Sequence, residues 1–372
     1  MHFHVLLSNN CNLQCNYCSG KAFSCSPRME KFALDESLPA ELSYDLHLLY
    51  NFISKDPDST LTFYGGEPTI RLDLIRKIMQ ECNPKQFMMQ TNGLLLNKLE
   101  PQYVNRFSAI LVSLDGNRTL TDYNRGKGTY DKVMENLKKI KRNGFKGELI
   151  ARMTITEHTN IYSAVKHLAS NKEFPFTSVH WQIDANFWND FKQRKNFKKW
   201  LEENYLPNTK RLLKFWISKM KKEGKVLRFY PFLDTTEDLL LGKKSLLRCG
   251  SGYANYSIMT NGFIAPCPIM AGMKDFYLGH IATAHPLKLK KVFVSGKCPS
   301  CTIYKFCGGR CLYSNIVKPW PEKGRNLVCK SVKEFRKMLL EVLPEIKELI
   351  EKKRISLNDF EHTKFCGPEI IP

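Results

Sequence analysis

The stretch Cys-Asn-Leu-Gln-Cys-Asn-Tyr-Cys, residues 11–18, places three thiols within eight residues. It directly follows a short apolar run, His2 to Leu7, that is typical of a buried strand. Three thiolates can hold a metal cluster while one metal position stays without a protein ligand, and that open position separates a reactive centre from a structural one. Cys25 lies outside this tight spacing. The stretch therefore predicts an open metal centre after the first strand.

Size and composition indicate a folded protein. The 372 residues, 43% of them apolar, allow one large domain and a smaller one. No secretory signal is recognisable and no apolar run reaches the roughly 20 residues that span a bilayer, so we expect a soluble, cytoplasmic protein without membrane contact. In a reducing compartment, the 13 cysteines point to metal rather than to disulfides.

The charge balance favours anionic partners, with 57 Lys and Arg residues against 36 Asp and Glu and a formal charge of +21. A Lys-rich surface without such a partner gives the same balance. The aromatic and basic segment 187–225, expected to be helical, has 12 Lys or Arg and four acidic residues between Asp190 and Lys225. It either binds an extended anionic chain such as RNA or forms an amphipathic helix with buried aromatics and solvated lysines.

Short β-rich runs alternate with longer amphipathic runs up to about residue 233, which is typical of repeated βα units. The pattern predicts an α/β fold, a partial (β/α)6 barrel of the TIM type, over residues 1–233. Rising cysteine and glycine density predicts a small cysteine-rich domain over residues 246–330, followed by a C-terminal helix and tail over residues 331–372. The expected strands are His2–Ser8, Leu61–Tyr64, Phe87–Thr91, Ala109–Leu114, Leu149–Thr156, Val179–Asp184 and Val226–Phe232, and the expected helices include Leu38–Ser54, Tyr130–Arg142 and Ser331–Lys353.

Four short motifs fall just past expected strand ends, at residues 11–18, 65–67, 91–93 and 114–116. Together, these motifs contain cysteine thiols, glycines and carboxylates. In a parallel barrel, the loops that follow the strands meet at one end, and that end carries the chemistry. We therefore expect these motifs to lie on one rim.

The spacing Cys11-x3-Cys15-x2-Cys18, with the aromatic Tyr17 before the last thiol, resembles that of the radical S-adenosylmethionine (SAM) enzymes. The resemblance implies that the three cysteines hold a [4Fe–4S] cluster whose open iron chelates SAM. It also implies an electron donor such as ferredoxin or flavodoxin, and cleavage of SAM to a 5′-deoxyadenosyl radical that removes a substrate hydrogen. The alternative is a structural zinc site with a distant fourth ligand.

Further segments fit the same family. Gly65-Gly66-Glu67-Pro68 resembles the signature at which backbone and carboxylate groups meet the methionyl ammonium of SAM. Ser113 and Arg152 become candidates for the ribose or the carboxylate of SAM, with a buried ion pair as the alternative for Arg152. By this resemblance, the candidate cofactor-binding residues are Tyr17, Gly65, Gly66, Glu67, Asn92, Ser113 and Arg152.

A second cysteine group has the spacing Cys249-x12-Gly262-x4-Cys267, then Cys298-x2-Cys301-x5-Cys307-x3-Cys311, then Cys329. It is similar to the SPASM extension of peptide-modifying members, which carries two auxiliary [4Fe–4S] clusters and so implies three clusters in total. A pair of zinc sites is the alternative. Transferred position by position, one auxiliary cluster is held by Cys298, Cys301, Cys307 and Cys329, and the other by Cys249, Cys267 and Cys311.

The Cys249 set lacks an obvious fourth cysteine. Either its iron stays open or Cys366 of the tail reaches back to it; Cys366 alternatively donates a hydrogen atom to a substrate radical or is an ordinary buried thiol. Pro268 follows Cys267 at the position where members that form formylglycine carry a catalytic acid, so the resemblance speaks against that activity. Asp184 is a candidate general base, with an N-cap or an ion pair as its alternative.

The resemblance covers nearly the whole chain. It implies a radical SAM enzyme that modifies a peptide or protein, including a ribosomally made precursor, by thioether formation, epimerisation, crosslinking or oxidation. With no leader-binding segment before the first expected strand, a leader peptide is expected to dock on the barrel, on segment 187–225 or on a separate protein. Two other classes stay open: a radical SAM enzyme that acts on RNA with steep salt dependence, and a zinc-stabilised binding module that is not an enzyme.

Overall fold

The structure is a computed structural model that describes residues 1–18 and 31–365, and the chain forms two compact units. The first unit comprises Met1–Leu114, Thr121–Ile150 and Gly250–Phe293. The second comprises Asp115–Leu120, Ala151–Cys249 and Val294–Pro372. The domain boundaries expected from the sequence, at residues 233, 246 and 330, stay a prediction.

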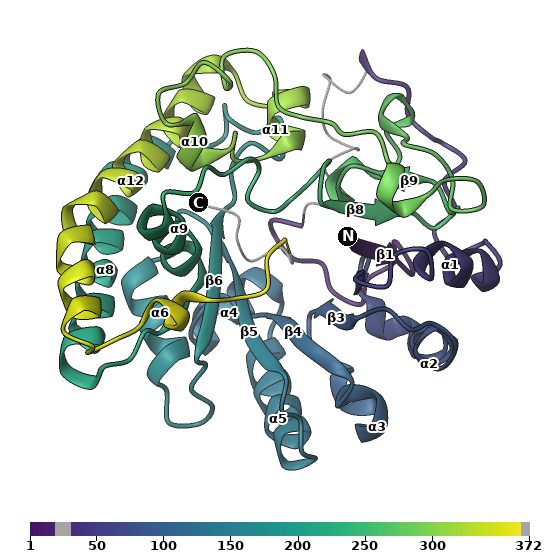
Figure 1. Cartoon of the computed structure of the whole chain (residues 1–372), viewed down its shortest axis with the longest axis horizontal. Helices are drawn as coiled ribbons and strands as arrows, with labels where there is room; N and C mark the ends of the chain where they lie inside the picture. The colour runs from purple at the N-terminus through teal and green to yellow at the C-terminus, as the bar shows by residue number, and fades with distance from the viewer. Residues whose placement is uncertain (19–30, 366–372) are drawn as a thin grey trace. The chain divides into compact units, whose positions relative to one another are not determined.

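The first unit is built on four parallel strands, which are β1 (His2–Leu6), β2 (Thr60–Tyr64), β3 (Gln86–Thr91) and β4 (Phe107–Ser113). They lie in the order β4-β3-β2-β1, and all four confirm expected strands. Phe3 of β1 is fully buried, and its ring centroid lies 5.2 Å from that of Phe52 in α1 (Leu46–Ile53). Parallel strands are normally buried on both faces, so they need helices packed against them to provide this cover. It also comes from α2 (Leu72–Glu81), α3 (Pro101–Val104) and α5 (Thr129–Arg142), which lie outside the strands (Figure 1).

Two strands from the cysteine-rich part extend this sheet. β8 (Asn255–Ile258) pairs in parallel with β1, and β9 (Ile264–Ala265) pairs antiparallel with β8. The turn between them contains Gly262 at φ +83°, a conformation that favours glycine. The sequence does not predict either strand, because runs this short show no clear period.

The strands of the second unit lie in the order β7-β6-β5. β5 (Glu148–Ile155), most of which belongs to this unit, and β6 (Ser178–Ile183) confirm expected strands, and β6 pairs in parallel with β7 (Arg228–Phe229). The expected strand Val226–Phe232 is wrong beyond these two residues, because α9 (Tyr230–Leu241) begins there. Pro231 lies in the first turn of α9, where its missing N–H is no loss and its fixed φ suits a helix.

Helices dominate the rest of the second unit (Figure 1). α8 (Leu206–Glu223) contacts α6 (Ile161–Ser170), and α12 (Glu322–Glu351) packs against both α8 and α9. The expected helix Ser331–Lys353 is therefore the later part of α12, which begins directly after Pro321. The remaining helices are α4 (Arg118–Arg125), α7 (Phe197–Trp200), a π-helical turn (Leu201–Tyr205), α10 (Tyr304–Cys307) and α11 (Leu312–Val317), with 3₁₀ turns at Pro68–Arg71, Leu96–Lys98, Pro268–Met270, Lys274–Phe276, Pro286–Lys288 and Leu357–Phe360.

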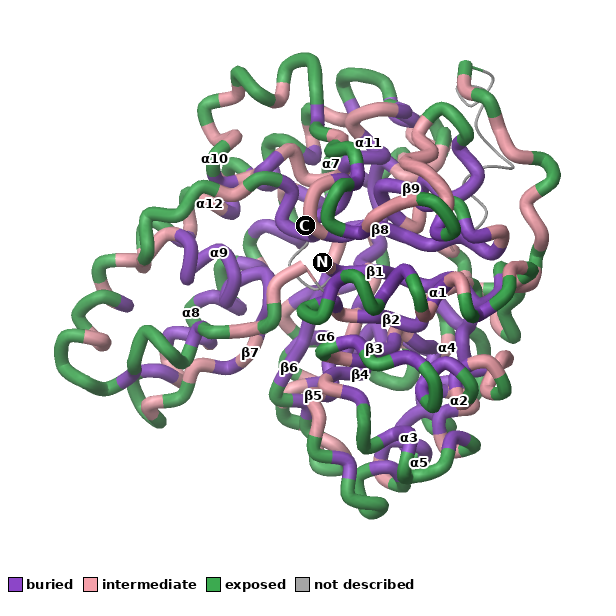
Figure 2. The backbone as a smooth tube through the Cα atoms, turned by 45° about the vertical axis from the view of Figure 1, so that its right-hand side comes forward, coloured by how far each residue is buried: buried purple, intermediate pink, exposed green. Residues whose placement is uncertain are grey.

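The large aromatic side chains in and beside segment 187–225 lie mostly in the core. Trp181, Trp200 and Trp216 are buried, while most lysines of the segment are exposed, and buried and exposed stretches alternate along α8 (Figure 2). The amphipathic interpretation is thus confirmed for these residues, and their rings cannot stack on nucleic-acid bases. In the described ranges, no helix is both long enough and apolar enough to cross a membrane.

Candidate functional site

The first cysteine stretch is an irregular loop that follows β1. The Cys18 N–H donates to the Cys15 carbonyl at 3.2 Å, and the Leu13 N–H donates to the Cys11 sulfur at 3.4 Å. Partial burial of the thiol raises the pKa of Cys11, and the charges of Glu67 and Cys18 add to this effect. The Cys11 thiol therefore lies within electrostatic reach of Cys18 and of Glu67, which follows β2.

Asn16 attaches this loop to α4. Its backbone N–H donates to the Asn124 carbonyl at 2.9 Å, and its side chain donates to the Tyr123 carbonyl at 2.9 Å. Next to it, the ring of Tyr17 lies 5.3 Å from the guanidinium carbon of Arg125. Sequence reasoning missed the role of Asn16; its place between two motif cysteines is the signal that the sequence offers.

The glycine motif after β2 lies directly against the residues that lead into the cysteine stretch. The Gly66 N–H donates to the Ser8 carbonyl at 2.8 Å, and the Glu67 N–H donates to the Asn10 carbonyl at 2.9 Å. A Cβ atom on Gly65 would lie 2.2 Å from the Ser8 oxygen, and one on Gly66 would lie 2.2 Å from the Asn10 oxygen. The glycines are therefore needed for contact between two backbone segments of the protein itself.

Glu67 joins the ends of β2 and β3. Its side chain is 1% exposed, and Oε1 accepts from the Thr69 N–H, the Thr69 hydroxyl and the Thr91 hydroxyl at 2.9, 2.6 and 2.7 Å. Oε2 accepts from the Asn92 N–H at 2.6 Å. Burial raises the pKa of Glu67, while these hydrogen bonds act in the opposite direction. The Glu67 carboxylate thus links the residues that follow β2 to those at the end of β3 by hydrogen bonds.

Asn92 lies beside a motif thiol. Its Nδ2 donates to Asn12 Oδ1 at 2.7 Å and lies 3.9 Å from the Cys11 sulfur. The edge of the first unit therefore brings together the cysteine stretch, the glycine motif and Asn92, as the strand ends predict. Ser113 is the last residue of β4 in the same unit, whereas Arg152 belongs to the second unit, where its Nη2 donates to Gln182 Oε1 at 3.4 Å.

The four cysteines grouped by the SPASM resemblance are neighbours in the second unit. Burial raises the pKa of Cys298, of Cys329 and of Cys307, that of Cys307 to about 11. The charge of at least one other member of the set, Cys301 included, adds to each shift, so these thiols lie within electrostatic reach of one another. Asn315 donates a side-chain N–H to the Cys298 sulfur at 3.4 Å. A set of four thiolates is the donor set that a [4Fe–4S] cluster requires.

The other predicted set is divided between the two units. Cys249 and Cys311 belong to the second unit and Cys267 belongs to the first. Cys249 and Cys267 are 8% and 6% exposed, and Cys311 caps α11 by accepting from the Ser314 N–H at 3.5 Å. Their grouping around one cluster stays a prediction. Cys366, the predicted extra ligand or hydrogen donor, lies outside the described residues.

Arg310, directly before Cys311, is another residue that sequence reasoning missed. Its guanidinium donates to the carbonyls of Ile183 and Ala185 at 3.3 and 3.4 Å, and it lies 6.0 Å from the centroid of the Phe187 ring. The auxiliary cysteine region of the second unit thus holds the loop that follows β6. The position of Arg310 next to a motif cysteine is the signal in the sequence that could have indicated this role.

Asp184 lies in that loop and is ion-paired. Arg194 donates to Asp184 Oδ2 at 2.6 Å, to Glu157 at 2.9 Å and to Asp190 at 2.7 Å, so the ion-pair alternative is confirmed. Burial raises the pKa of Asp184 to about 6, although Arg194 acts in the opposite direction. A role of Asp184 as a general base stays a prediction.

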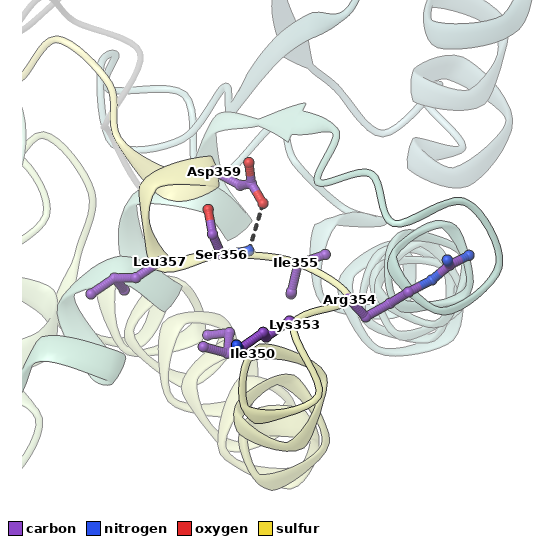
Figure 3. A pocket seen from close by; sticks show the side chains of 7 residues that line it. All are labelled: Ile350, Lys353, Arg354, Ile355, Ser356, Leu357 and Asp359. Carbon is purple, nitrogen blue, oxygen red and sulfur yellow. Dashed lines mark hydrogen bonds between the residues drawn. The ribbon is translucent and has the colours of Figure 1, made fainter.

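A surface pocket of about 380 Å³ lies where α12 ends (Figure 3). The Ser356 N–H donates to the Asp359 carboxylate there at 2.7 Å, and the Arg354 Nε donates to the Lys221 carbonyl at 3.1 Å. These polar groups are engaged in holding the chain after α12, and the pocket contains none of the predicted site residues. It is lined by Ile350, Lys353, Arg354, Ile355, Ser356, Leu357 and Asp359.

Comparisons with known proteins agree with this geometry. Residues 5–167 match the family model of the Radical SAM superfamily. The cysteine-type anaerobic sulfatase-maturating enzyme of Clostridium novyi (strain NT) is 22% identical over 360 residues, which cover 88% of this chain and 92% of that protein. An uncharacterized protein of Methanothermobacter thermautotrophicus is 29% identical over 165 residues, 41% of this chain and 58% of that protein.

Solved structures share the fold over most of the chain. Native anSMEcpe with bound AdoMet and Kp18Cys peptide has a TM-score of 0.69 at 19% identity, covering 93% of this chain and 98% of that one. Streptococcus suis SuiB bound to precursor peptide SuiA has a TM-score of 0.53 at 18% identity, covering 85% and 72%. The α/β partial barrel with a cysteine-rich C-terminal region is thereby confirmed.

Residues 5–167 of the chain are a domain of the radical SAM superfamily. Within it, the protein is an enzyme related to the peptide-modifying maturases. The family implies SAM and a [4Fe–4S] cluster as cofactors.

Proposed function

We propose that this enzyme reductively cleaves SAM and removes a hydrogen atom from a peptide or protein substrate, with an electron from a donor of the ferredoxin or flavodoxin type. When bound, the cluster and SAM supply the one-electron chemistry that forms the deoxyadenosyl radical. The observation that carries the proposal is the meeting of the cysteine stretch, Gly65–Glu67 and Asn92 on one edge of the first unit.

Cys11, Cys15 and Cys18 would hold the radical-generating cluster. They offer three soft thiolates on one irregular loop, which suits an iron–sulfur cluster with one iron left for SAM. The Asn92 amide lies 3.9 Å from the Cys11 sulfur, so its N–H can donate to that thiolate. Hydrogen bonds to cluster sulfurs stabilise the reduced state, which the cleavage of SAM requires.

The residues around this loop fit the binding of SAM. The Glu67 carboxylate already accepts four hydrogen bonds within the rim, so we assign the contact with the methionyl ammonium to the backbone carbonyls of Gly65 and Gly66. Ser113 and Arg152 stay candidates for the ribose or the carboxylate. Tyr17, whose ring lies beside Arg125, would contact the adenosyl part.

The cysteine-rich region would hold two auxiliary [4Fe–4S] clusters, which makes three clusters in the protein. The effects of neighbouring thiolates of this set on the pKa values of Cys298, Cys307 and Cys329 support one of them. Cys249, Cys267 and Cys311 would hold the other. Cys366 remains the proposed fourth ligand of that set, or alternatively a hydrogen donor to the substrate radical.

The substrate class is inferred from the relatives. Two similar structures contain a bound peptide, the Kp18Cys peptide in anSMEcpe and the precursor peptide SuiA in SuiB. Pro268 after Cys267 argues against formylglycine formation, so thioether formation, epimerisation, crosslinking and other oxidations are the proposed outcomes. Asp184, with a pKa near physiological pH, would accept the proton that such a reaction releases.

The test is anaerobic reconstitution followed by chemical reduction with SAM. We expect deoxyadenosine, together with a mass change in a precursor peptide produced alongside the enzyme. Iron far below about 12 atoms per chain, the content of three four-iron clusters, or no deoxyadenosine would contradict the proposal. Deoxyadenosine formation with a mass change in RNA instead of peptide would shift the assignment to the RNA-modifying class.

A further inference from the structure

Arg248 lies between two of the cysteine loops in the second unit. It directly precedes Cys249 and is 4% exposed. Its Nε and Nη2 donate to the carbonyl of Phe306 at 3.0 and 2.8 Å, and Phe306 directly precedes Cys307. One guanidinium therefore joins the residues before two cysteines that the proposed function assigns to different auxiliary clusters.

The backbones of the two loops also run against each other. The Ser245 N–H donates to the Lys305 carbonyl at 2.8 Å. A Cβ atom on Gly308 would lie 1.6 Å from the Leu246 oxygen, so the contact admits no side chain there. A slip of one residue in an extended segment moves a thiol by roughly 3.3 Å. Metal–sulfur bonds of about 2.3 Å do not tolerate such a shift, so the relative register of these loops must be fixed.

The other side of the guanidinium is anchored to α9. Its Nη1 donates to Asp238 Oδ2 at 2.8 Å and also to the carboxylate of Asp234. Burial opposes ionisation of Asp234, but Arg248, His362 and Lys364 together outweigh it and hold the pKa of Asp234 below its usual range. The planar fork of an arginine can bind a carbonyl on one side and two carboxylates on the other, whereas a lysine ammonium cannot span both.

The C-terminal segment completes this charge cluster. Lys364 donates to Asp234 Oδ1 at 2.7 Å and to Glu237, and His362 Nε2 lies 3.1 Å from Asp234 Oδ1. Asp234, Glu237 and His362 have the spacing of metal ligands, but the Lys364 ammonium already bonds both carboxylates. We therefore interpret the cluster as an anchor that links the chain end to Arg248 through Asp234.

We propose that Arg248 is a positioning residue that sets the register between the Cys249 and Cys307 loops and so allows both auxiliary clusters to assemble. The inference rests on the proposed function, because it assumes auxiliary clusters at these cysteines. It goes beyond that function by assigning their assembly to a residue that is not a ligand.

The test compares the full-length protein with the Arg248→Met and Arg248→Lys variants after anaerobic reconstitution. The wild type should bind about 12 iron atoms per chain, and Arg248→Met should bind about four while keeping the electron paramagnetic resonance change that SAM addition causes at the remaining cluster. Arg248→Lys should be intermediate, because it keeps the charge without the fork. Hydrogen exchange of metal-free Arg248→Met should rise in residues 304–308.

A matched control is Arg354→Met. Like Arg248, Arg354 uses its guanidinium to hold backbone carbonyls, those of Lys221 and Lys222, but neither it nor its partners are next to a cysteine. This variant should bind the wild-type amount of iron. An equal loss of iron in the control would mean that general destabilisation is the cause, and would overturn the inference.

The remaining outcomes separate the inference from the proposed function. If the Arg248→Met variant binds about 12 iron atoms per chain and its spectra are unchanged, the inference is overturned but the proposed function is not. A wild-type protein with about four iron atoms or fewer overturns both. If Arg248→Met loses its circular dichroism signal, Arg248→Lys decides: wild-type iron content in that variant overturns the inference, and a partial loss with native dichroism supports it.

Discussion

The two cysteine-bearing regions of this enzyme are held in different ways. In the first unit, residues 9–12 are exposed, and the loop is attached by the neutral amides of Asn16 and Asn92. In the second unit, Cys249 is buried, and the guanidinium groups of Arg248 and Arg310 hold the neighbouring backbone. Both regions have cysteine spacings that suit iron–sulfur clusters, yet Cys249 is buried whereas Cys11 is exposed; Cys298, Cys301, Cys307 and Cys311 are half-buried and Cys329 is exposed.

The difference fits the two tasks. A radical-generating cluster must admit SAM, and the exposure of residues 9–12 suits that task. An auxiliary cluster without that requirement gains from burial, since hydrogen bonds and low exposure set its potential. Buried ligands, however, need a scaffold that fixes their register, and the buried Arg248 supplies it at the cost of burying the carboxylates of Asp234 and Asp238 with it.

The largest effect is expected at the accessible loop. Cys15→Ala removes one of three ligands of the radical cluster, so deoxyadenosine formation should fall by about 10³-fold or more, while the auxiliary clusters remain detectable by their spectra. Chromatography of the reaction products measures this. Cys82→Ala, a buried thiol with no assigned role, is the control and should keep its activity. Turnover by Cys15→Ala would place the reactive cluster elsewhere.

In the auxiliary cysteine region of the second unit, we expect the largest loss of stability from Gly308→Ala. Gly308 and Gly242 both end helices in the left-handed conformation, at φ +65° and +64°. Alanine at Gly242 meets nothing within 4 Å and should cost about 1 kcal/mol, whereas alanine at Gly308 collides with the Leu246 backbone. We expect Gly308→Ala to lose several times more unfolding free energy in urea, together with auxiliary iron. Equal effects at both sites would show that the contact is not tight.

Asp184 should make the second unit sensitive to pH. Its folded pKa of about 6 lies above the ordinary 3.8, so the folded state holds a proton that the unfolded state has released. The contribution of Asp184 to the unfolding free energy should therefore fall as the pH rises from about 4 to 6, by about 1–3 kcal/mol. In Asp184→Asn this contribution should be absent from urea denaturation curves measured across that range.

Asp58→Asn is the control for this pH dependence. The hydrogen bond and charge of Lys85 hold the pKa of Asp58 below its ordinary value, so this exposed carboxyl contributes a dependence of opposite sign. A pH dependence in Asp184→Asn equal to that of the wild type would show that Asp184 titrates normally. It would also remove the support for a general base at this position.

The smallest effect is expected from Asn92→Ala. The change removes the hydrogen bond to Asn12 and the contact with the Cys11 sulfur, which should cost about 1 kcal/mol. SAM should bind several-fold more weakly in equilibrium titration of the reconstituted enzyme. An affinity equal to that of the wild type would mean that the loop keeps its shape without this amide. The contrast between a loop attached by amides and an auxiliary region held by arginines would then weaken.

Sequence reasoning succeeded where a pattern is local. The strands around Val5 and Phe63 were predictable because each is a short run rich in apolar, aromatic and β-branched residues. The cysteine stretch and the Gly65–Glu67 motif were predictable because their residues are consecutive. Strand β8 and helix α9 were not, because β8 is too short to show a period and α9 was mistaken for the continuation of a strand.

The amino-acid sequence by itself determined the accessible loop of residues 11–18: three thiols in eight residues after a strand, with motifs at neighbouring strand ends. Only the tertiary structure decided which residues support that loop and which residues hold the auxiliary cysteine region of the second unit. Gly66 faces Asn10, and Arg248 reaches Phe306, across long stretches of chain. Such contacts depend on which distant segments fold against each other, and neither composition nor spacing records that.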